Sequence, residues 1–230
     1  MLFRSPRRPR RWRQRQADEA VGEALGPVCD GLNQAENSLS ALAAGKAETV
    51  AEGERAFDQG HYERARAILT PLAEAGNAKA QFIIGKMFAE GRGIAKDETK
   101  GANWFRKAAE QGHAGGQVAL GVMYATGQGV AQDAAEAVRW YRLAAEQGHA
   151  DGQFNLGVMS ATGQGVTQDA AVAVRWFRKA AEQGHVGGQF NLGVMYDNGQ
   201  GIIQDEAEAM RWYRKAAEQG LADGQYNLGV

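Results

Sequence analysis

The chain has 230 residues, 44% of them hydrophobic, and a formal net charge of -1, which is the composition of a folded protein. Its single cysteine, Cys29, excludes an intramolecular disulfide and a thiolate-rich metal site. Glycine is frequent, at 31 residues, and proline is rare, at 4, a balance that favours helices joined by glycine turns over a disordered chain.

The N-terminal segment is strongly basic, with seven arginines and no acidic residue in the first fifteen positions. This charge pattern predicts a disordered basic tail over residues 1–16. A nucleic-acid, anionic-membrane or transit-peptide role is the alternative, and Trp12 favours an interfacial contact. Residues 17–46 match no pattern and are expected to be partly helical. Because neither a secretory signal nor a membrane-spanning stretch is visible, the cytoplasm is the default expectation.

Residues 47–76 predict a short hairpin of two helices. Its pattern consists of Gly53, Gly60, Tyr62, Ala65, Ile68 and Leu72. Pro71 falls inside the second helix and is expected to kink or shorten it, because proline lacks the backbone donor that a helix interior needs.

From residue 77 onward the sequence repeats with a period of 36 residues. The period is carried by Trp104, Trp140, Trp176 and Trp212. The complete units are 77–112, 113–148, 149–184 and 185–220, and residues 221–230 begin another. A period of this size indicates one supersecondary unit stacked on copies of itself, so function is expected from an extended surface.

Within the unit 113–148, apolar spacing predicts helix A over 114–126 and helix B over 134–147. Asp133 is expected to cap helix B, with Glu136 three residues later reaching back to the Asp133 amide, and Gly148 to end the helix in a left-handed turn.

Small residues are expected where the two helices of a unit approach, with tryptophan and tyrosine filling the space on either side. The recurring structural residues are Gly85, Trp104, Leu120, Gly121, Tyr124, Ala137, Trp140, Leu156, Gly157, Trp176, Leu192, Gly193, Tyr196 and Trp212. Ser160 replaces the tyrosine of its neighbours, which predicts a weak joint in unit 149–184.

The pattern resembles the Sel1-like repeat, a relative of the tetratricopeptide repeat, over residues 77–230. The residues that carry it in one unit are Leu120-Gly121, Tyr124, Gly127 to Val130, Asp133, Ala137, Trp140-Tyr141 and Ala144 to Gly148. The unit 47–76 looks more like a degenerate tetratricopeptide hairpin. The resemblance implies an all-α, right-handed α-solenoid of antiparallel helix hairpins that acts as a protein–protein interaction scaffold or adaptor, without catalysis.

Catalytic and metal-binding motifs are not visible, so no cofactor, metal or small-molecule substrate is expected. The loop Gly127-Gln128-Gly129 lacks the third glycine of a dinucleotide site and predicts a turn. His113, His149 and His185 recur once per unit, and their imidazoles are expected to bond the last carbonyls of helix B. Some cysteine-rich Sel1-like proteins are associated with β-lactams, which leaves a penicillin-interacting enzyme as an alternative function, although the cysteine pairs and the Ser-x-x-Lys motif are missing.

In related superhelices, helix A residues that point away from helix B line a concave groove. The equivalent positions in this chain are Phe82, Lys86, Val118, Val122, Phe154, Val158, Phe190, Val194 and Tyr226. This apolar row predicts a surface for a helix or extended segment of a protein partner. The competing interpretation is that some of these side chains only pack adjacent repeats together.

Overall fold

The computed structural model describes residues 49–220. The chain divides into two compact units, residues 1–51 and residues 52–230, and only the helical residues 49–51 of the first are described. The basic tail, Cys29, the segment 17–46 and Tyr226 lie outside the described residues.

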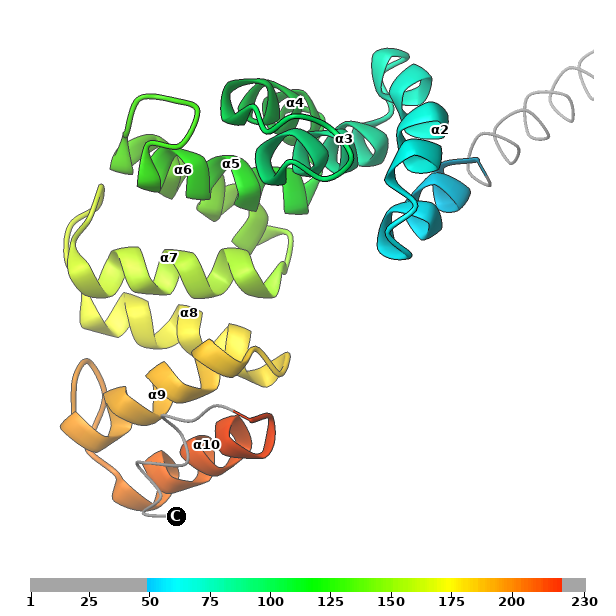
Figure 1. Ribbon diagram of the computed structural model, residues 1–230. Coiled ribbons are helices and arrows are strands. Elements are labelled where there is room, and N and C mark those ends of the chain that lie inside the picture. Colours follow the sequence, from blue (N-terminus) through cyan, green and yellow to red (C-terminus); the bar gives the residue numbers. More distant parts are fainter. Residues whose placement is uncertain (1–48, 221–230) are drawn as a thin grey trace, which may run out of the picture. The chain divides into compact units, whose positions relative to one another are not determined.

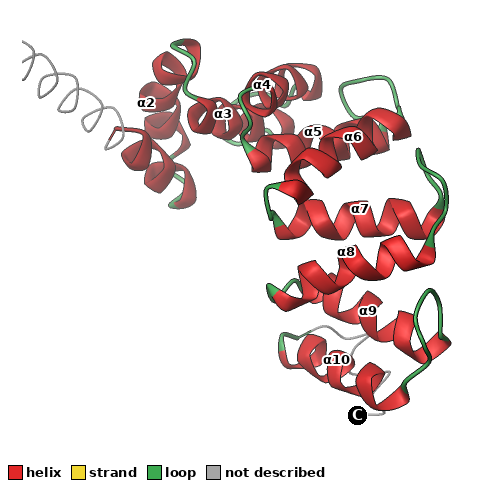
Figure 2. Ribbon diagram, turned by 180° about the vertical axis from the view of Figure 1, so that it is seen from behind, coloured by secondary structure: helices red, strands yellow, loops and turns green. Residues whose placement is uncertain are grey.

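The described part of the second unit is built from helices joined by short turns and loops. After the helical residues 52–58 come α2 (Tyr62–Glu74), α3 (Ala78–Glu90), α4 (Glu98–Glu110), α5 (Ala114–Thr126), α6 (Ala134–Glu146), α7 (Ala150–Thr162), α8 (Ala170–Glu182), α9 (Val186–Asn198) and α10 (Glu206–Glu218). Each helix packs against the next, so that the hairpins follow one another in chain order (Figures 1 and 2). This is the expected solenoid of helix hairpins, with helix A and helix B of one repeat represented by α5 and α6.

The helices begin and end close to the predicted residues, but one of the predicted capping hydrogen bonds is absent. Helix α5 has the predicted bounds, and α6 ends one residue early. The carboxylate of Asp133 accepts from the amides of Ala135 (2.9 Å) and Glu136 (3.0 Å), as a helix cap should. The predicted return bond from Glu136 is wrong, because the Asp133 amide donates to the Tyr124 carbonyl (2.9 Å) and Glu136 pairs with Arg139.

The two helices of a repeat meet through an aromatic ring that the sequence analysis overlooked. A Cβ atom on Gly121 would lie 2.6 Å from Cε1 of Tyr141, the residue after Trp140, and Gly157 meets the ring of Phe177 in the same way. The expected approach of small residues is also present, since a Cβ atom on Gly85 or Gly193 would lie 3.3 Å from the carbonyl oxygen of Gly101 or Ala209 on helix B, at the position equivalent to Ala137. Burial raises the pKa of Tyr141 to about 12.

The tryptophans wedge the seam between successive repeats. Trp140 is 5% exposed and packs on a cluster that contains Phe105 of the preceding helix B and Leu120 of its own helix A. The other three rings are half-buried, each with a lysine ammonium over its outer face. The distances from nitrogen to ring centre are 4.1 Å for Lys107 on Trp104, 4.5 Å for Lys179 on Trp176 and 4.2 Å for Lys215 on Trp212.

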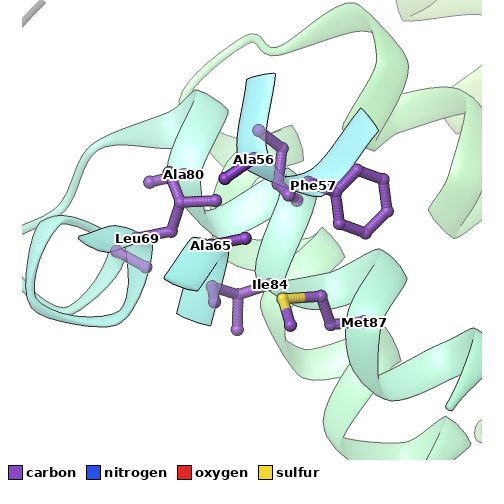
Figure 3. Packing of buried hydrophobic residues seen from close by; sticks show 9 residues of the cluster. Ala56, Phe57, Ala65, Leu69, Ala80, Ile84 and Met87 are labelled. Atoms are coloured by element: carbon purple, nitrogen blue, oxygen red, sulfur yellow. The ribbon is translucent and has the colours of Figure 1, made fainter. Parts of the chain in front are cut away.

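The first hairpin of the unit has its own core, shown in Figure 3. Side chains from residues 52–58, α2 and α3 meet there. They include Ala56, Phe57, Ala65, Leu69, Ala80, Ile84 and Met87. Pro71 does not shorten α2, which has the same 13 residues as α3, so the expected shortening is wrong and the kink stays a prediction. The helix continues because the Pro71 carbonyl still accepts from the Ala75 amide (3.0 Å).

A buried glutamine in each helix A joins three helices, and the sequence analysis missed it. Gln117, 3% exposed, donates from Nε2 to the carbonyl of Ala109 in the preceding repeat (3.2 Å). Its Oε1 accepts from Nε2 of Gln147 at the end of its own helix B (2.7 Å). The other pairs are Gln81 with Gln111, Gln153 with Gln183, and Gln189 with Gln219. We call this arrangement the glutamine bridge.

The Gly-x-Gly loops are turns, as predicted, and they also touch the neighbouring repeat. Gly129 has a φ of 68°, and a Cβ atom there would overlap the carbonyl oxygen of Glu98 in the preceding helix B. The loop glycine thus allows both a left-handed backbone and a close contact across the seam.

Candidate partner-binding groove

The residues of the expected groove come from four A helices. The described members are Phe82, Lys86, Val118, Val122, Phe154, Val158, Phe190 and Val194, which we call the helix A groove. All of them are partly exposed, and Val122, at 38%, is the most open of the hydrophobic ones. A row of accessible apolar side chains on successive helices is the arrangement that a bound peptide segment requires.

The groove is hollowed at two places. A cavity of about 390 Å³ lies between α3, α5 and α7, and we call it the central cavity. Its lining includes Phe82, Lys86, Val118, Val122, His149 and Asp151. A smaller cavity of about 210 Å³ lies between α7 and α9, where Val158 and Val194 face Asn191. The central cavity is therefore lined by four of the eight described groove residues, and the smaller cavity by two others.

The phenylalanines of the row also pack repeats together. The ring centre of Phe82 lies 5.8 Å from that of Phe105 and 4.8 Å from that of His113. Phe154 stacks on His185 at 4.5 Å, and Phe190 lies 5.6 Å from Tyr213. Phe82 and Phe154 thus pack against the histidine of the next repeat, as the competing interpretation expected, whereas Phe190 meets Tyr213 of its own repeat. All three side chains remain partly exposed, and the partner surface stays a prediction.

The recurring histidines cap helices in a way the sequence analysis did not foresee. Nδ1 of His113 accepts from the amide of Gly116 and Nδ1 of His185 from the amide of Gly188, both at 3.0 Å. The imidazoles thus satisfy the start of helix A, and the expectation that they bond the carbonyls of helix B is wrong. A neutral ring nitrogen is an acceptor, which suits the free amides of a helix start.

His149 differs from its two counterparts. It makes no side-chain bond at the start of α7, and its Nδ1 is buried without a hydrogen-bond partner. The same imidazole lines the central cavity. Buried polar atoms are nearly always paired in folded proteins, so an unpaired one at the wall of a cavity marks an incomplete site.

Burial lowers the pKa of His113, and the charges of Lys79 and His149 lower it further. Glu54 acts in the opposite direction but more weakly. His113 is therefore neutral at pH 7, which agrees with its role as an acceptor at the helix start.

Both signs of charge stand at the central cavity. Nζ of Lys86 lies 5.1 Å from the ring centre of Phe57 and 5.8 Å from that of Phe82. On the opposite wall, the carboxylate of Asp151 lies 3.2 Å from Nε2 of His185. The cavity thus combines an apolar floor with Lys86 and Glu90 on the α3 wall and Asp151 on the α7 wall, so charged groups of both signs are available to a bound segment.

A third cavity, of about 470 Å³, lies between α2, α3 and α4 and is lined by Thr70, Phe88 and Trp104 among others. In a later repeat the equivalent positions hold an arginine and a tyrosine, and Arg106 donates to the hydroxyl of Tyr124 (3.0 Å). The cavity opens where this pair is replaced by Thr70 and Phe88. The signal in the sequence for this cavity is the presence of Thr70 and Phe88 in place of arginine and tyrosine.

The described residues offer little for catalysis. Ser160, the serine that the penicillin-interacting alternative would need, is 2% exposed and donates to the carbonyl of Leu156 (2.8 Å). Over residues 49–220 no group of three histidine, cysteine or acidic side chains is placed to hold a metal ion. No helix in that range has both the length and the apolar character needed to cross a lipid bilayer.

Stacked hairpins, seams with recurring contacts and a row of helix A side chains define a solenoid repeat protein, a class that binds on extended surfaces. The family model of the Sel1 repeat matches residues 78–113, 114–149, 150–185 and 186–221, and the chain belongs to this family. The matched units begin one residue after the predicted ones. Sel1 repeat proteins generally mediate protein–protein interactions.

Solved structures of Sel1 repeat proteins resemble the chain. The protective antigen c5321 of uropathogenic Escherichia coli, which has an SLR fold, is 35% identical with a TM-score of 0.73; the alignment covers 82% of this chain but 41% of that one. A Sel1 repeat protein from Oxalobacter formigenes is 34% identical, also with a TM-score of 0.73, over 78% of this chain and 74% of that one. A Klebsiella pneumoniae protein, 20% identical with a TM-score of 0.56 over 83% and 94%, shares the fold. No curated protein sequence showed significant similarity.

Proposed function

We propose that this chain is a non-catalytic adaptor that holds a segment of a partner protein along the helix A groove. The observation that supports the proposal best is the central cavity, where partly exposed apolar side chains of α3 and α5 and the polar residues His149 and Asp151 at the start of α7 surround one space. Binding energy in protein interfaces concentrates in a few anchor side chains that enter such pockets.

The spacing of the two groove cavities supports an elongated ligand rather than a small molecule. The central cavity lies between α3, α5 and α7, and the smaller one between α7 and α9. A peptide segment that follows the groove can place one side chain in each cavity, and its backbone stays accessible to polar groups such as Asn191.

Two substitutions test whether the partner binds in the groove or on another face of the molecule: Val122→Glu in the groove and Leu143→Glu on α6. Val122 in the groove and Leu143 on α6 have nearly the same exposure, 38% and 37%. A photo-crosslinking residue at position 122 identifies the partner, and its affinity is then measured for purified variants. Val122→Glu is expected to weaken binding at least tenfold, because a carboxylate enters an apolar surface, and Leu143→Glu to change it less than twofold.

Equal losses of affinity in the two variants, or no loss at position 122, would contradict binding in the groove.

Catalysis is tested separately with the chromogenic β-lactam nitrocefin. Nitrocefin is expected to hydrolyse at the same rate with the purified chain as in buffer alone, because Ser160 is buried and donates a hydrogen bond to its own helix. Turnover that is proportional to protein concentration would contradict a purely binding role.

A further inference from the structure

Two of the groove phenylalanines, Phe82 and Phe154, make the same contacts between successive repeats, and we call this pattern the rule of the seams. Phe82 and Phe154 each lie over the histidine that begins the next repeat, with ring centres 4.8 Å and 4.5 Å apart. A glycine lies beneath each ring: a Cβ atom on Gly115 or Gly187 would be 3.3 Å or 2.9 Å from it. Each of these histidines also bonds the helix start through Nδ1.

The rule is broken at the seam between α5 and α7. Val118 stands 36 residues after Phe82 and 36 before Phe154, and Asp151 stands where the other seams have Gly115 and Gly187. His149 therefore has no ring over it among the described residues, and its Nδ1 is one of two buried side-chain atoms there without a hydrogen-bond partner, the other being Nε1 of Trp140. The central cavity opens at this position, lined by Val118, His149 and Asp151.

We propose that the central cavity is a subsite for an aromatic side chain of the partner segment, which lies over His149 where the chain's own phenylalanine is missing. This inference rests on the proposed function. A volume of about 390 Å³ is within the range of 300 to 1,000 Å³ usual for ligand pockets, and an aromatic ring stacks favourably on an imidazole.

Charge complementarity extends the proposal to the neighbouring residue of the segment. Among the described residues the Asp151 carboxylate is within ion-pair distance of the His185 imidazole only, and 58% of its side chain is exposed. A lysine or arginine beside the aromatic residue would supply a permanent positive charge. The occupant is thus a protein segment with an aromatic residue next to a basic one.

The first experiment uses short probe peptides and the full chain. Acetylated and amidated Gly-Phe-Arg-Gly is titrated while the NMR signals of the Val118 and Val122 methyl groups and of the His149 ring are followed. These signals are expected to shift with Gly-Phe-Arg-Gly, to shift at least fivefold less with Gly-Ala-Arg-Gly, and to shift less with Gly-Phe-Glu-Gly. Equal shifts with the alanine peptide would overturn the aromatic subsite.

The second experiment fills and recreates the gap. Val118→Phe supplies the missing ring, although Asp151 remains where the other seams have glycine, and is expected to abolish the shifts. Phe154→Val opens a second gap and is expected to add shifts at the His185 ring. Persistence of the His149 shifts in Val118→Phe would overturn the proposal. Amide spectra of both variants establish that they are folded.

The partner captured through position 122 separates this inference from the proposed function. A loss of affinity of tenfold or more in Val122→Glu and also in Val118→Phe supports the groove as the binding surface and the aromatic subsite within it. Loss in Val122→Glu alone overturns the aromatic subsite and leaves the groove as the binding surface. Unchanged affinity in both variants overturns the two proposals together.

Discussion

The contact between Gly121 and Tyr141 sets the distance between the two helices of a repeat. The ring edge occupies the place where any other residue would carry Cβ, and the same pairing recurs as Gly85 with Phe105 and Gly157 with Phe177. The glycine is required here for its lack of a side chain and not for its backbone, because its conformation is helical.

Gly121→Ala is expected to destabilise the chain by about 1 to 3 kcal/mol, although alanine is the better helix former, because the new methyl group overlaps Cε1 of Tyr141. Urea unfolding measures the loss. In a Tyr141→Leu background the ring edge is absent, so the added cost of Gly121→Ala should fall below about 1 kcal/mol. An unchanged cost in the double variant would contradict the assignment.

His113→Asn tests the histidine cap through its pH dependence. Folding lowers the pKa of His113 below the value of about 6.5 that the unfolded chain has, so the unfolded state binds more protons in this range. The contribution of neutral His113 to the free energy of unfolding is complete above pH 6.5, and it is lost as the pH falls through the pKa that His113 has in the folded state. Asn77 already caps the preceding repeat by accepting from the Ala80 amide (2.9 Å), so asparagine keeps the cap.

Thermal unfolding of both proteins between pH 7.5 and 5 checks this prediction. The wild type is expected to lose more stability than His113→Asn over this range, and the difference isolates His113, since the other histidines are common to both. Parallel curves would mean that His113 is not the group responsible.

At the scale of the helices, the glutamine bridge holds each seam with polar contacts inside an apolar layer. One side chain serves a carbonyl of the preceding helix B and the amide group of a second glutamine on its own helix B. Because both bonds are directional, they fix how far the helices can slide along one another, which apolar packing alone does poorly.

Gln117→Leu is expected to cost about 1 to 3 kcal/mol, because it removes two hydrogen bonds of a buried side chain. Among the described residues it leaves the Ala109 carbonyl only backbone amides such as that of Gly112, and the Gln147 side-chain amide only the Leu143 carbonyl. Gln132→Leu is the matched control: Gln132 also donates to a helix carbonyl, that of Ala125 (2.8 Å), but on the exposed surface. Chemical denaturation should give a loss below about 0.5 kcal/mol for the control. Equal losses would argue against a seam role.

The sequence predicted the helices well because their ends are fixed by local chemistry. Asp133 and the glycine turns carry the same signals in every repeat, so α6 begins at the predicted residue 134 and α5 ends at the predicted residue 126, before Gly127. The order of stacking also follows from the repeat, since a hairpin can bury its apolar faces only against its copies.

The contacts across seams were harder to predict. A repeat tells which residues recur, but not which neighbour each one faces, so Tyr141 and Gln117 were overlooked and the histidines were assigned to the wrong helix end. The groove cavity at Val118 was predictable only as a departure from the phenylalanine at its equivalent positions, and the orphan nitrogen of His149 needed coordinates.

At the scale of the whole array, stability is a sum over repeats and seams, because helices pack mainly against their neighbours in sequence. Local opening is expected where a seam has lost a contact. Arg106 and Arg178 each donate to a tyrosine hydroxyl of the next repeat, at 3.0 Å and 2.9 Å, whereas Ser160 gives Arg142 no such acceptor.

Native-state hydrogen exchange is expected to show less protection in α7 than in α5 or α9, because of this missing pair. Ser160→Tyr should restore an acceptor for Arg142 and raise the protection of α7 by about 1 kcal/mol. The amides of α3 serve as the internal reference, since they lie two repeats away. Higher protection in α7 than in α5 of the wild type would contradict a weak joint at Ser160.

The glutamine bridge has a consequence for how such a chain can change in length. Every seam presents the same donor and the same acceptor, so two repeats that were never adjacent can be joined as well as two that were. Unequal crossing-over between near-identical coding stretches can therefore delete or duplicate a 36-residue block without creating a foreign junction. The number of repeats, and with it the extent of binding surface, becomes a quantity that evolution can adjust in whole steps.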